Sequence, residues 1–205
     1  GDSPARIDQW VPESPREELK PDFATESPRR FDGVPALEIR ANGKDSVNGW
    51  WTRTVPVSPG RFYEFRTLFQ TGIEERDLDR KVLARVIWLD ADGGQAALPE
   101  YPPTLAGGDW KGIRGIYQAP AQAVSAKLEL VLRWVSTGSV LFRETAFEET
   151  DPPESRKVKV AAVHFRPVDS RSARENLEKF AGYIEKAGAE NADIVLLPEG
   201  ITLVG

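Results

Sequence analysis

The hydrophobic pattern of this chain changes its period once, near residue 150, and this change constrains the fold more than any other feature. Over residues 31–148, short runs of β-branched and aromatic residues alternate with turns rich in Gly, Pro, Asn and Asp. Such runs, punctuated at short intervals, are typical of antiparallel β-sandwiches. Beyond residue 156, the apolar residues of one segment recur at helical spacing instead. The sequence therefore predicts two parts with different architectures.

Seven strands are expected in the first part. In the clearest of them, three leucines and Trp134 occupy every second position, so all four are expected to point into the core. Trp88 also lies inside an apolar run and is expected to be buried. The seven expected strands are Ala36–Arg40, Gly49–Val57, Arg61–Gln70, Val82–Asp90, Gly112–Gln118, Ala126–Val135 and Ser139–Glu148.

Four segments are predicted along the chain. Residues 1–30 are rich in Pro and charge and are interpreted as an extended lead-in, with Trp10 and Phe23 as anchors. Residues 31–148 form the β-sandwich, and residues 149–156, with two adjacent prolines, form a stiff linker. Residues 157–205 form the second part.

The second part is predicted to form one strand–helix–strand crossover. The two segments expected as strands, Val158–Phe165 and Ile194–Leu197, are apolar enough to be buried on both faces, as parallel strands are. Between them, Ser172 and Glu175 have the spacing of a capping box, and Gly188 is expected to end the helix. The predicted apolar stripe of this helix consists of Ala173, Leu177, Phe180, Ile184 and Ala187.

Composition excludes several kinds of chemistry. The chain has no Cys, so it has no disulfide and no thiolate nucleophile, and its single His excludes multi-His metal sites and Ser-His-Asp catalysis. We therefore expect no cofactor. A net charge of −5 does not suggest a nucleic-acid surface, and no apolar run approaches the ~20 residues of a membrane span. The chain opens without Met, which indicates a processed or engineered fragment, and the predicted β-sandwich suggests by analogy an exported bacterial protein whose signal has been removed.

The motifs of the second part resemble the start of the nitrilase, or carbon–nitrogen hydrolase, superfamily. They are the strand Val160-Ala161-Ala162-Val163, the helical Glu175-Asn176-Leu177 and the segment from Ala192 to Pro198-Glu199. The resemblance implies the beginning of an α-β-β-α sandwich with a Glu-Lys-Cys catalytic triad acting on amides or nitriles. It assigns Glu199 as the general base, which we expect to be partly desolvated at its strand tip.

The chain departs from this family pattern in two ways. The Lys and Cys would lie downstream of residue 205, so we expect the 205 residues to be inactive and a longer parent to be the enzyme. His164 stands where Gln is common in the family, and Gly200 stands where an apolar residue is frequent. Glu199 as a solvent-facing loop residue is the alternative interpretation.

The first part resembles the galactose-binding-domain-like, jelly-roll β-sandwiches that accompany carbohydrate-active enzymes. The residues that carry this resemblance run from Gly49 to Tyr63 and from Ala84 to Gly93. It implies that exposed aromatic rings bind sugar, while core packing of the same rings is the alternative. The candidate ligand-binding residues are Trp50, Trp51, Tyr101 and Trp110.

Three further points stay open at the level of sequence. Asp90 and Asp92 are weak candidates for a Ca²⁺ site, although their Gly-bearing segment is more typical of a turn. The chain as a hydrolase fragment competes with a pure carbohydrate-binding module and with a sandwich that mediates protein interaction. Because two isolated strands are marginally stable, residues 157–205 should pack against the sandwich, form homo-oligomers or join further chain.

Overall fold

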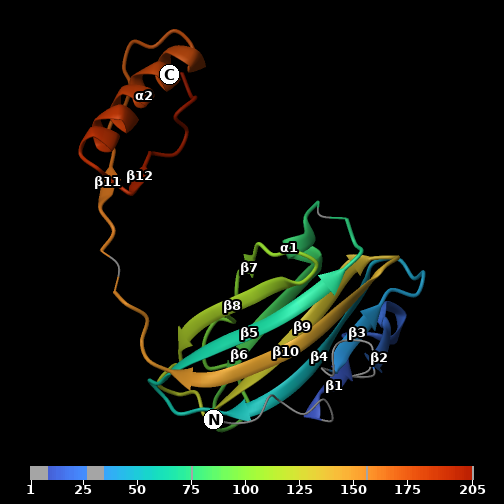
Figure 1. Cartoon of the computed structure of the whole chain (residues 1–205). Helices are drawn as coiled ribbons and strands as arrows, with labels where there is room; N and C mark the ends of the chain where they lie inside the picture. Colours follow the sequence, from blue (N-terminus) through green and yellow to red (C-terminus); the bar gives the residue numbers. More distant parts are fainter. Residues whose placement is uncertain (1–8, 27–34, 75, 156, 205) are drawn as a thin grey trace. The chain divides into compact units, whose positions relative to one another are not determined.

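The computed structural model describes residues 9–26, 35–74, 76–155 and 157–204. The chain forms two compact units, Gly1–Pro153 and Glu154–Gly205, each of which is described by itself (Figure 1). Across the described ranges, the structure contains no helix that is long and apolar enough to cross a membrane.

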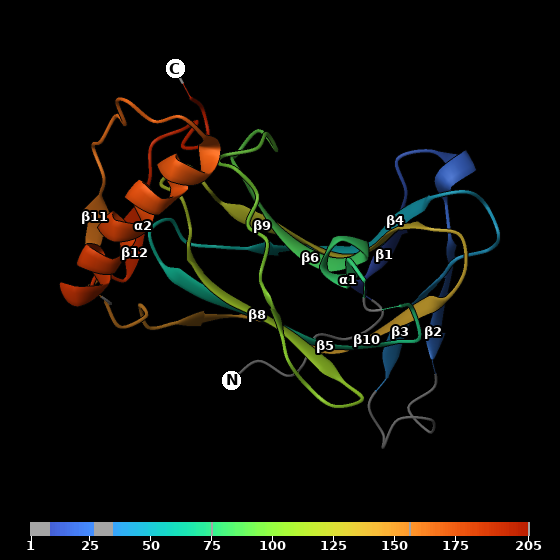
Figure 2. The same cartoon turned by 90° about the horizontal axis from the view of Figure 1, so that it is seen from above.

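The first unit consists of two antiparallel sheets packed as layers (Figure 2). Sheet A has the strand order β1-β4-β9-β6, and sheet B has the order β2-β3-β10-β5-β8-β7. The predicted antiparallel β-sandwich is therefore confirmed. Its elements are β1 (Val11–Glu13), the 3₁₀ helix η2 (Glu17–Leu19), β2 (Asp22–Glu26), β3 (Ala36–Arg40), β4 (Val47–Pro56), β5 (Phe62–Thr71), α1 (Leu78–Lys81), β6 (Val82–Leu89), β7 (Thr104–Leu105), β8 (Lys111–Gln118), β9 (Ser125–Val135) and β10 (Ser139–Thr150).

Alternating apolar side chains from both sheets fill the space between the layers. Trp88 is fully buried, with ring centroids 6.4 Å from Tyr63 and 6.1 Å from Phe147. On sheet B, Phe69 and Phe142 are also fully buried, and their ring centroids lie 6.2 Å apart. Since successive strand residues point to opposite faces, the same alternation leaves a polar row on the outer face of each sheet.

The prediction that Trp134 belongs to the core is wrong. Val47 pairs with Val135 and the next residue, Asn48, pairs with Arg133, so Trp134 is the extra residue of a β-bulge. Its φ is +60°, and 54% of the residue is exposed. The bulge interrupts the alternation after Leu132, and Val135 takes the inward position instead.

Residues 9–26, part of the extended lead-in expected over residues 1–30, contribute strands to both sheets of the sandwich. β1 pairs with β4, and β2 pairs with β3, so each sheet gains an edge strand. Trp10 is buried in the core, and the ring of Phe23 packs edge-on against Trp51 at 5.3 Å. Gly49 makes this approach possible, because a Cβ there would lie 2.6 Å from Cδ of Pro21. Residues 1–8 and 27–30 lie outside the described residues.

The second unit is a strand–helix–strand unit whose two strands are parallel. Val160 pairs with Ile194 and Ala162 with Leu196, so pairing covers a shorter stretch than the predicted Val158–Phe165. The described residues form this unit alone, and the α-β-β-α sandwich that it would begin stays a prediction. Its elements are β11 (Val160–Ala162), α2 (Ala173–Ala189) and β12 (Ile194–Leu196).

The start of α2 follows the sequence prediction, whereas its end does not. The backbone N–H of Glu175 donates to Ser172 Oγ at 3.2 Å, and the Arg171 N–H donates to the Glu175 carboxylate at 2.9 Å. At the other end, the helix continues through Gly188 to Ala189. Asn191 has the left-handed φ of +55° there, and its N–H donates to the Gly188 carbonyl, so Asn191 does what was expected of the glycine.

The predicted burial of the second unit is reached only in part. Phe180 is buried, and Phe165 packs on it with ring centroids 5.5 Å apart. Leu177 and Ile184, two members of the predicted stripe, are 44% and 45% exposed. Val160, Ile194 and Leu196 of the strands are about half exposed, because the described residues of this unit provide one helix and no second covering layer.

Candidate functional site

The four aromatic residues predicted to bind ligand do not form one site. Trp51 is 6% exposed, and its indole N–H donates to the Glu38 carbonyl at 3.0 Å. It therefore offers no free ring face to a ligand and belongs to the core. Tyr101 is 54% exposed and lies in the long connection between β6 and β7.

Trp50 lies on the outer face of sheet A within a network of charged side chains. Its indole N–H donates to the Glu13 carboxylate at 3.1 Å, and the Arg85 guanidinium lies 5.0 Å from its ring centroid. Lys127 Nζ joins Glu13 at 2.8 Å and Glu129 at 3.5 Å. Because these contacts occupy the indole N–H and one side of the ring, we interpret Trp50 as a structural residue.

The two carboxylates of this network have pKa shifts of opposite sign. Burial raises the pKa of Glu129 above 4.5, despite the nearby cations of Arg85 and Lys127. Burial acts on Glu13 in the same direction, but hydrogen bonds from Lys127 and Trp50 lower its pKa overall. Desolvation therefore dominates at Glu129, although its Oε2 lies 2.5 Å from Arg85 Nη2.

Trp110 lies in the β7–β8 connection, directly before β8 of sheet B, which lines a pocket on the outer face of the sheet. The Arg143 guanidinium stacks over the Trp110 ring at 4.0 Å from its centroid. Arg143 pairs across β10 and β5 with Leu68, which lines the pocket. Trp110 thus precedes the lining residue Gly112 by two positions, without being one of the residues that line this pocket.

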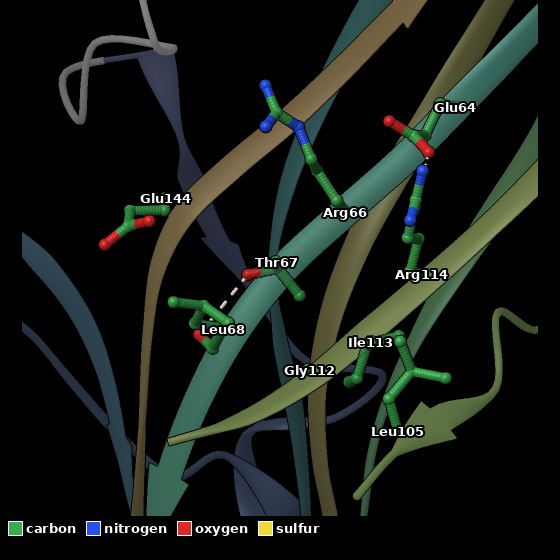
Figure 3. A pocket seen from close by; sticks show the side chains of 9 residues that line it. All are labelled: Glu64, Arg66, Thr67, Leu68, Leu105, Gly112, Ile113, Arg114 and Glu144. Carbon is green, nitrogen blue, oxygen red and sulfur yellow. Dashed lines mark hydrogen bonds and ion pairs between the residues drawn. The ribbon is translucent and has the colours of Figure 1, made fainter. Parts of the chain in front are cut away.

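We call this pocket the sheet B pocket. It has a volume of about 400 Å³, and β5, β7, β8 and β10 all contribute to it. Figure 3 shows the side chains of Glu64 and Arg114 reaching toward each other from neighbouring strands at one end of it. Its lining residues are Glu64, Arg66, Thr67, Leu68, Leu105, Gly112, Ile113, Arg114 and Glu144.

Charges at the sheet B pocket are arranged in pairs. Arg114 Nε lies 2.5 Å from Glu64 Oε1, and Arg66 Nη2 lies 3.1 Å from Glu148 Oε2. Arg66 and Arg114 are cross-strand partners, and so are Glu64 and Glu148, so both ion pairs join the same two rows of the sheet. The next row contains two apolar side chains of the pocket, Leu68 and Leu105, beside the guanidinium groups.

A bulge in β10 shapes one wall of the sheet B pocket. The register shifts between Arg143 and Ala146, and Glu144 has a φ of +53°. The inward hydroxyls of Thr145 and Thr67 are hydrogen-bonded at 2.8 Å, which anchors the bulge to β5. Such bulges re-aim side chains beside functional sites, and here the bulge places Glu144 in the pocket lining.

The Asp90–Asp92 segment is a tight turn. The Asp90 carboxylate accepts hydrogen bonds from the backbone N–H groups of Asp92 at 3.0 Å and Gly94 at 2.8 Å. The described residues contain no group of three or more His, Cys, Asp or Glu that could hold a metal ion. This geometry supports the turn interpretation over the Ca²⁺ interpretation.

In the second unit, Glu199 lies just beyond β12 and lines a pocket of about 450 Å³. His164, Arg166, Phe180 and Pro198 line the same pocket. Glu199 is exposed, which contradicts the expected partial desolvation at the strand tip, since the described residues leave its outer side open. His164 and Arg166 are exposed as well.

Comparison with known proteins gives matches among solved structures alone. No family model and no curated protein matches the chain. A tailspike protein 4 domain of bacteriophage CBA120 is 14% identical over 71% of this chain, with a TM-score of 0.52. The CBM22-1–GH10 modules of Clostridium thermocellum xylanase 10B, complexed with xylohexaose, are 11% identical over 88% of this chain, with a TM-score of 0.51.

The chain spans 20% and 34% of the lengths of these two proteins. A separate CBM22 module of the same xylanase is 14% identical over 70% of this chain and 88% of its own, with a TM-score of 0.48. At such identities the similarity shows the fold. The first unit is thus an antiparallel β-sandwich of the type found in carbohydrate-binding modules.

Proposed function

We propose that the first unit is a carbohydrate-binding module that binds a neutral oligosaccharide in the sheet B pocket. The observation that carries this proposal is a pocket in which the apolar Leu68 and Leu105 lie beside the row of Arg66 and Arg114. A pyranose ring presents apolar C–H groups on its faces and hydroxyls at its rim. Apolar side chains next to a row of hydrogen-bonding groups match that chemistry.

The charges favour a neutral ligand over a polyanion. Each guanidinium at the pocket has a carboxylate within 3.1 Å, so the surface offers hydrogen bonds without a net positive field. Arg and Glu held in this way can donate to and accept from neighbouring hydroxyls of one sugar. The fold gives independent support, since the similar xylanase modules were solved with a bound xylohexaose.

Calorimetric titration of the variant Arg114→Ala tests this proposal. With xylohexaose, cellohexaose and β-1,4-galactotriose as probes, we expect at least one to bind the unaltered chain. Arg114→Ala should weaken that binding about tenfold or more, because it removes a donor and leaves Glu64 unpaired. The matched control is Arg61→Ala, which removes an exposed Arg–Glu149 pair outside the pocket lining. Absence of binding by every probe, or equal affinity of Arg114→Ala, would contradict the proposal.

We propose a second function for the second unit, as the opening part of a carbon–nitrogen hydrolase. The observation in its favour is the parallel β11–β12 pair with Glu199 directly beyond it, in a pocket shared with His164. A carboxylate there can act as a general base toward a thiol nucleophile supplied by further chain. The substrate would be a small amide or nitrile.

Activity of a longer gene product tests this second function. A polypeptide that continues beyond residue 205 should release ammonia from amide or nitrile substrates, and Glu199→Gln should reduce kcat by at least about 10²-fold. The 205-residue chain should be inactive, because it contains no Cys. His164→Gln is the control within the same pocket and should retain activity. A continuation without a thiol, or an active Glu199→Gln enzyme, would remove this proposal.

A further inference from the structure

The bulge residue Trp134 is held in a strained backbone conformation with its ring exposed. A φ of +60° is an outlier for a bulky aromatic residue and costs about 1–3 kcal/mol, so it persists where the surroundings impose it. The ring is nevertheless 54% exposed and contributes little to the core. Strain without a packing benefit points to a role outside the fold.

The Trp134 ring is also held in place by neighbouring groups. The Arg133 guanidinium lies 3.9 Å from its centroid, and Arg133 Nε donates to the Arg80 carbonyl at 2.8 Å. One face of the indole is thereby covered by a side chain that is itself anchored to α1. A ring fixed in this way can receive a ligand on its other face with little loss of conformational freedom.

Trp134 lines a pocket of about 350 Å³ with side chains that suit a sugar. Glu74 offers a carboxylate, Lys81 an ammonium group, and Ser136 and Thr137 offer hydroxyls. These residues come from the β5–α1 connection, the end of α1 and the β9–β10 turn, and none of them lines the sheet B pocket. The volume is near the lower end of the ~300–1,000 Å³ typical of small-molecule sites.

We propose that this Trp134 pocket is a second carbohydrate site, which binds a terminal sugar of a neutral oligosaccharide. An aromatic ring with a carboxylate, an ammonium group and hydroxyls around it matches the apolar face and hydroxyl rim of one pyranose. Glu74 and Lys81 carry opposite charges, so the two charges balance each other without a charged ligand. The site extends the proposed function to a second surface and does not depend on the sheet B pocket.

Site-resolved ¹⁹F NMR of the 5-fluorotryptophan-labelled chain tests the proposal. The resonances are assigned by single Trp→Phe variants. Each of the three sugar probes used above is then added to ~10 mM, a concentration tenfold above the Kd of a weak site of about 1 mM. We expect the Trp134 resonance to shift with at least one sugar, and Lys81→Ala to weaken the binding that this shift reports about tenfold or more.

The outcomes separate the two sites. A sugar-induced shift of the Trp134 resonance that persists in Arg114→Ala supports the second site. It does so even if the Trp110 resonance stays unchanged and the sheet B pocket binds no sugar. A Trp134 resonance that moves with no probe overturns the second site, whatever Trp110 does. A shift of Trp134 that disappears in Arg114→Ala also overturns it, because the shift would then report binding in the sheet B pocket.

Discussion

Replacing Trp88 with Ala should lower the free energy of unfolding of the chain by about 3–5 kcal/mol. Trp88 is fully buried between the two sheets and packs against Tyr63 and Phe147, whose rings stack on each other at 5.1 Å. Truncation removes the apolar area of the indole and leaves a cavity that two β-sheets, each fixed by its hydrogen bonds, cannot close. Urea unfolding followed by far-UV circular dichroism measures the effect, with an unchanged m-value as the sign that stability alone has changed.

Trp134→Ala is the matched control, because it removes the same side chain from an exposed position. We expect its free energy of unfolding to stay within ~0.5 kcal/mol of the unaltered chain. A large loss in Trp134→Ala would mean that this indole packs in the core after all. Equal and small effects in both variants would contradict the burial of Trp88.

Glu129→Ala should destabilise the first unit by about 3 kcal/mol, the lower end of the effect of breaking a buried ion pair. Glu129 is 2% exposed and its carboxylate pairs with Arg85, whose own side chain is 22% exposed. Loss of the carboxylate removes the ion-pair partner of Arg85, whereas Lys127 keeps its ion pair with Glu13. The double variant Arg85→Met with Glu129→Leu should recover most of the loss, since it removes both charges and keeps the volume.

The raised pKa of Glu129 adds a pH dependence of known sign. Between pH 4.5 and the raised pKa, the folded state binds more protons than the unfolded state, so stability falls as the pH rises through this window. Glu129→Gln, which cannot titrate, should flatten that fall. Urea midpoints measured from pH 4 to pH 8 test this, and an identical slope in Glu129→Gln would show that another group titrates.

The sequence predicted the sandwich well because its strands follow simple alternation. β3 has the predicted bounds, and the leucines of β9 point inward as expected. The failure at Trp134 has a local cause, since one bulge residue reverses the direction of every side chain after it. Where the extra residue falls depends on pairing with β4, which the sequence of β9 alone does not contain.

The sheet B pocket could be predicted less well than the fold. Trp110 was a candidate from its aromatic type, whereas Arg66 and Arg114 were missed. Outward positions of β5 and β8 could have been deduced from alternation, but not the fact that these strands are neighbours with Arg66 opposite Arg114. Register across strands 48 residues apart in sequence comes from the whole sheet. Trp51 was misassigned for a related reason, since alternation leaves open which of two adjacent tryptophans faces inward.

The edge strands of the sandwich determine whether copies of the chain can associate by strand addition at high concentration. β1 is one edge strand of sheet A; it contains three residues, one of them Pro12. β7 is one edge strand of sheet B and contains two residues. Along the other edge of sheet A, Glu100 bridges to Val86 and so occupies backbone groups of β6. Short, proline-bearing or covered edges give a second molecule little backbone to add a strand to. At these three edges, strand addition between copies, and with it fibril growth, is therefore disfavoured.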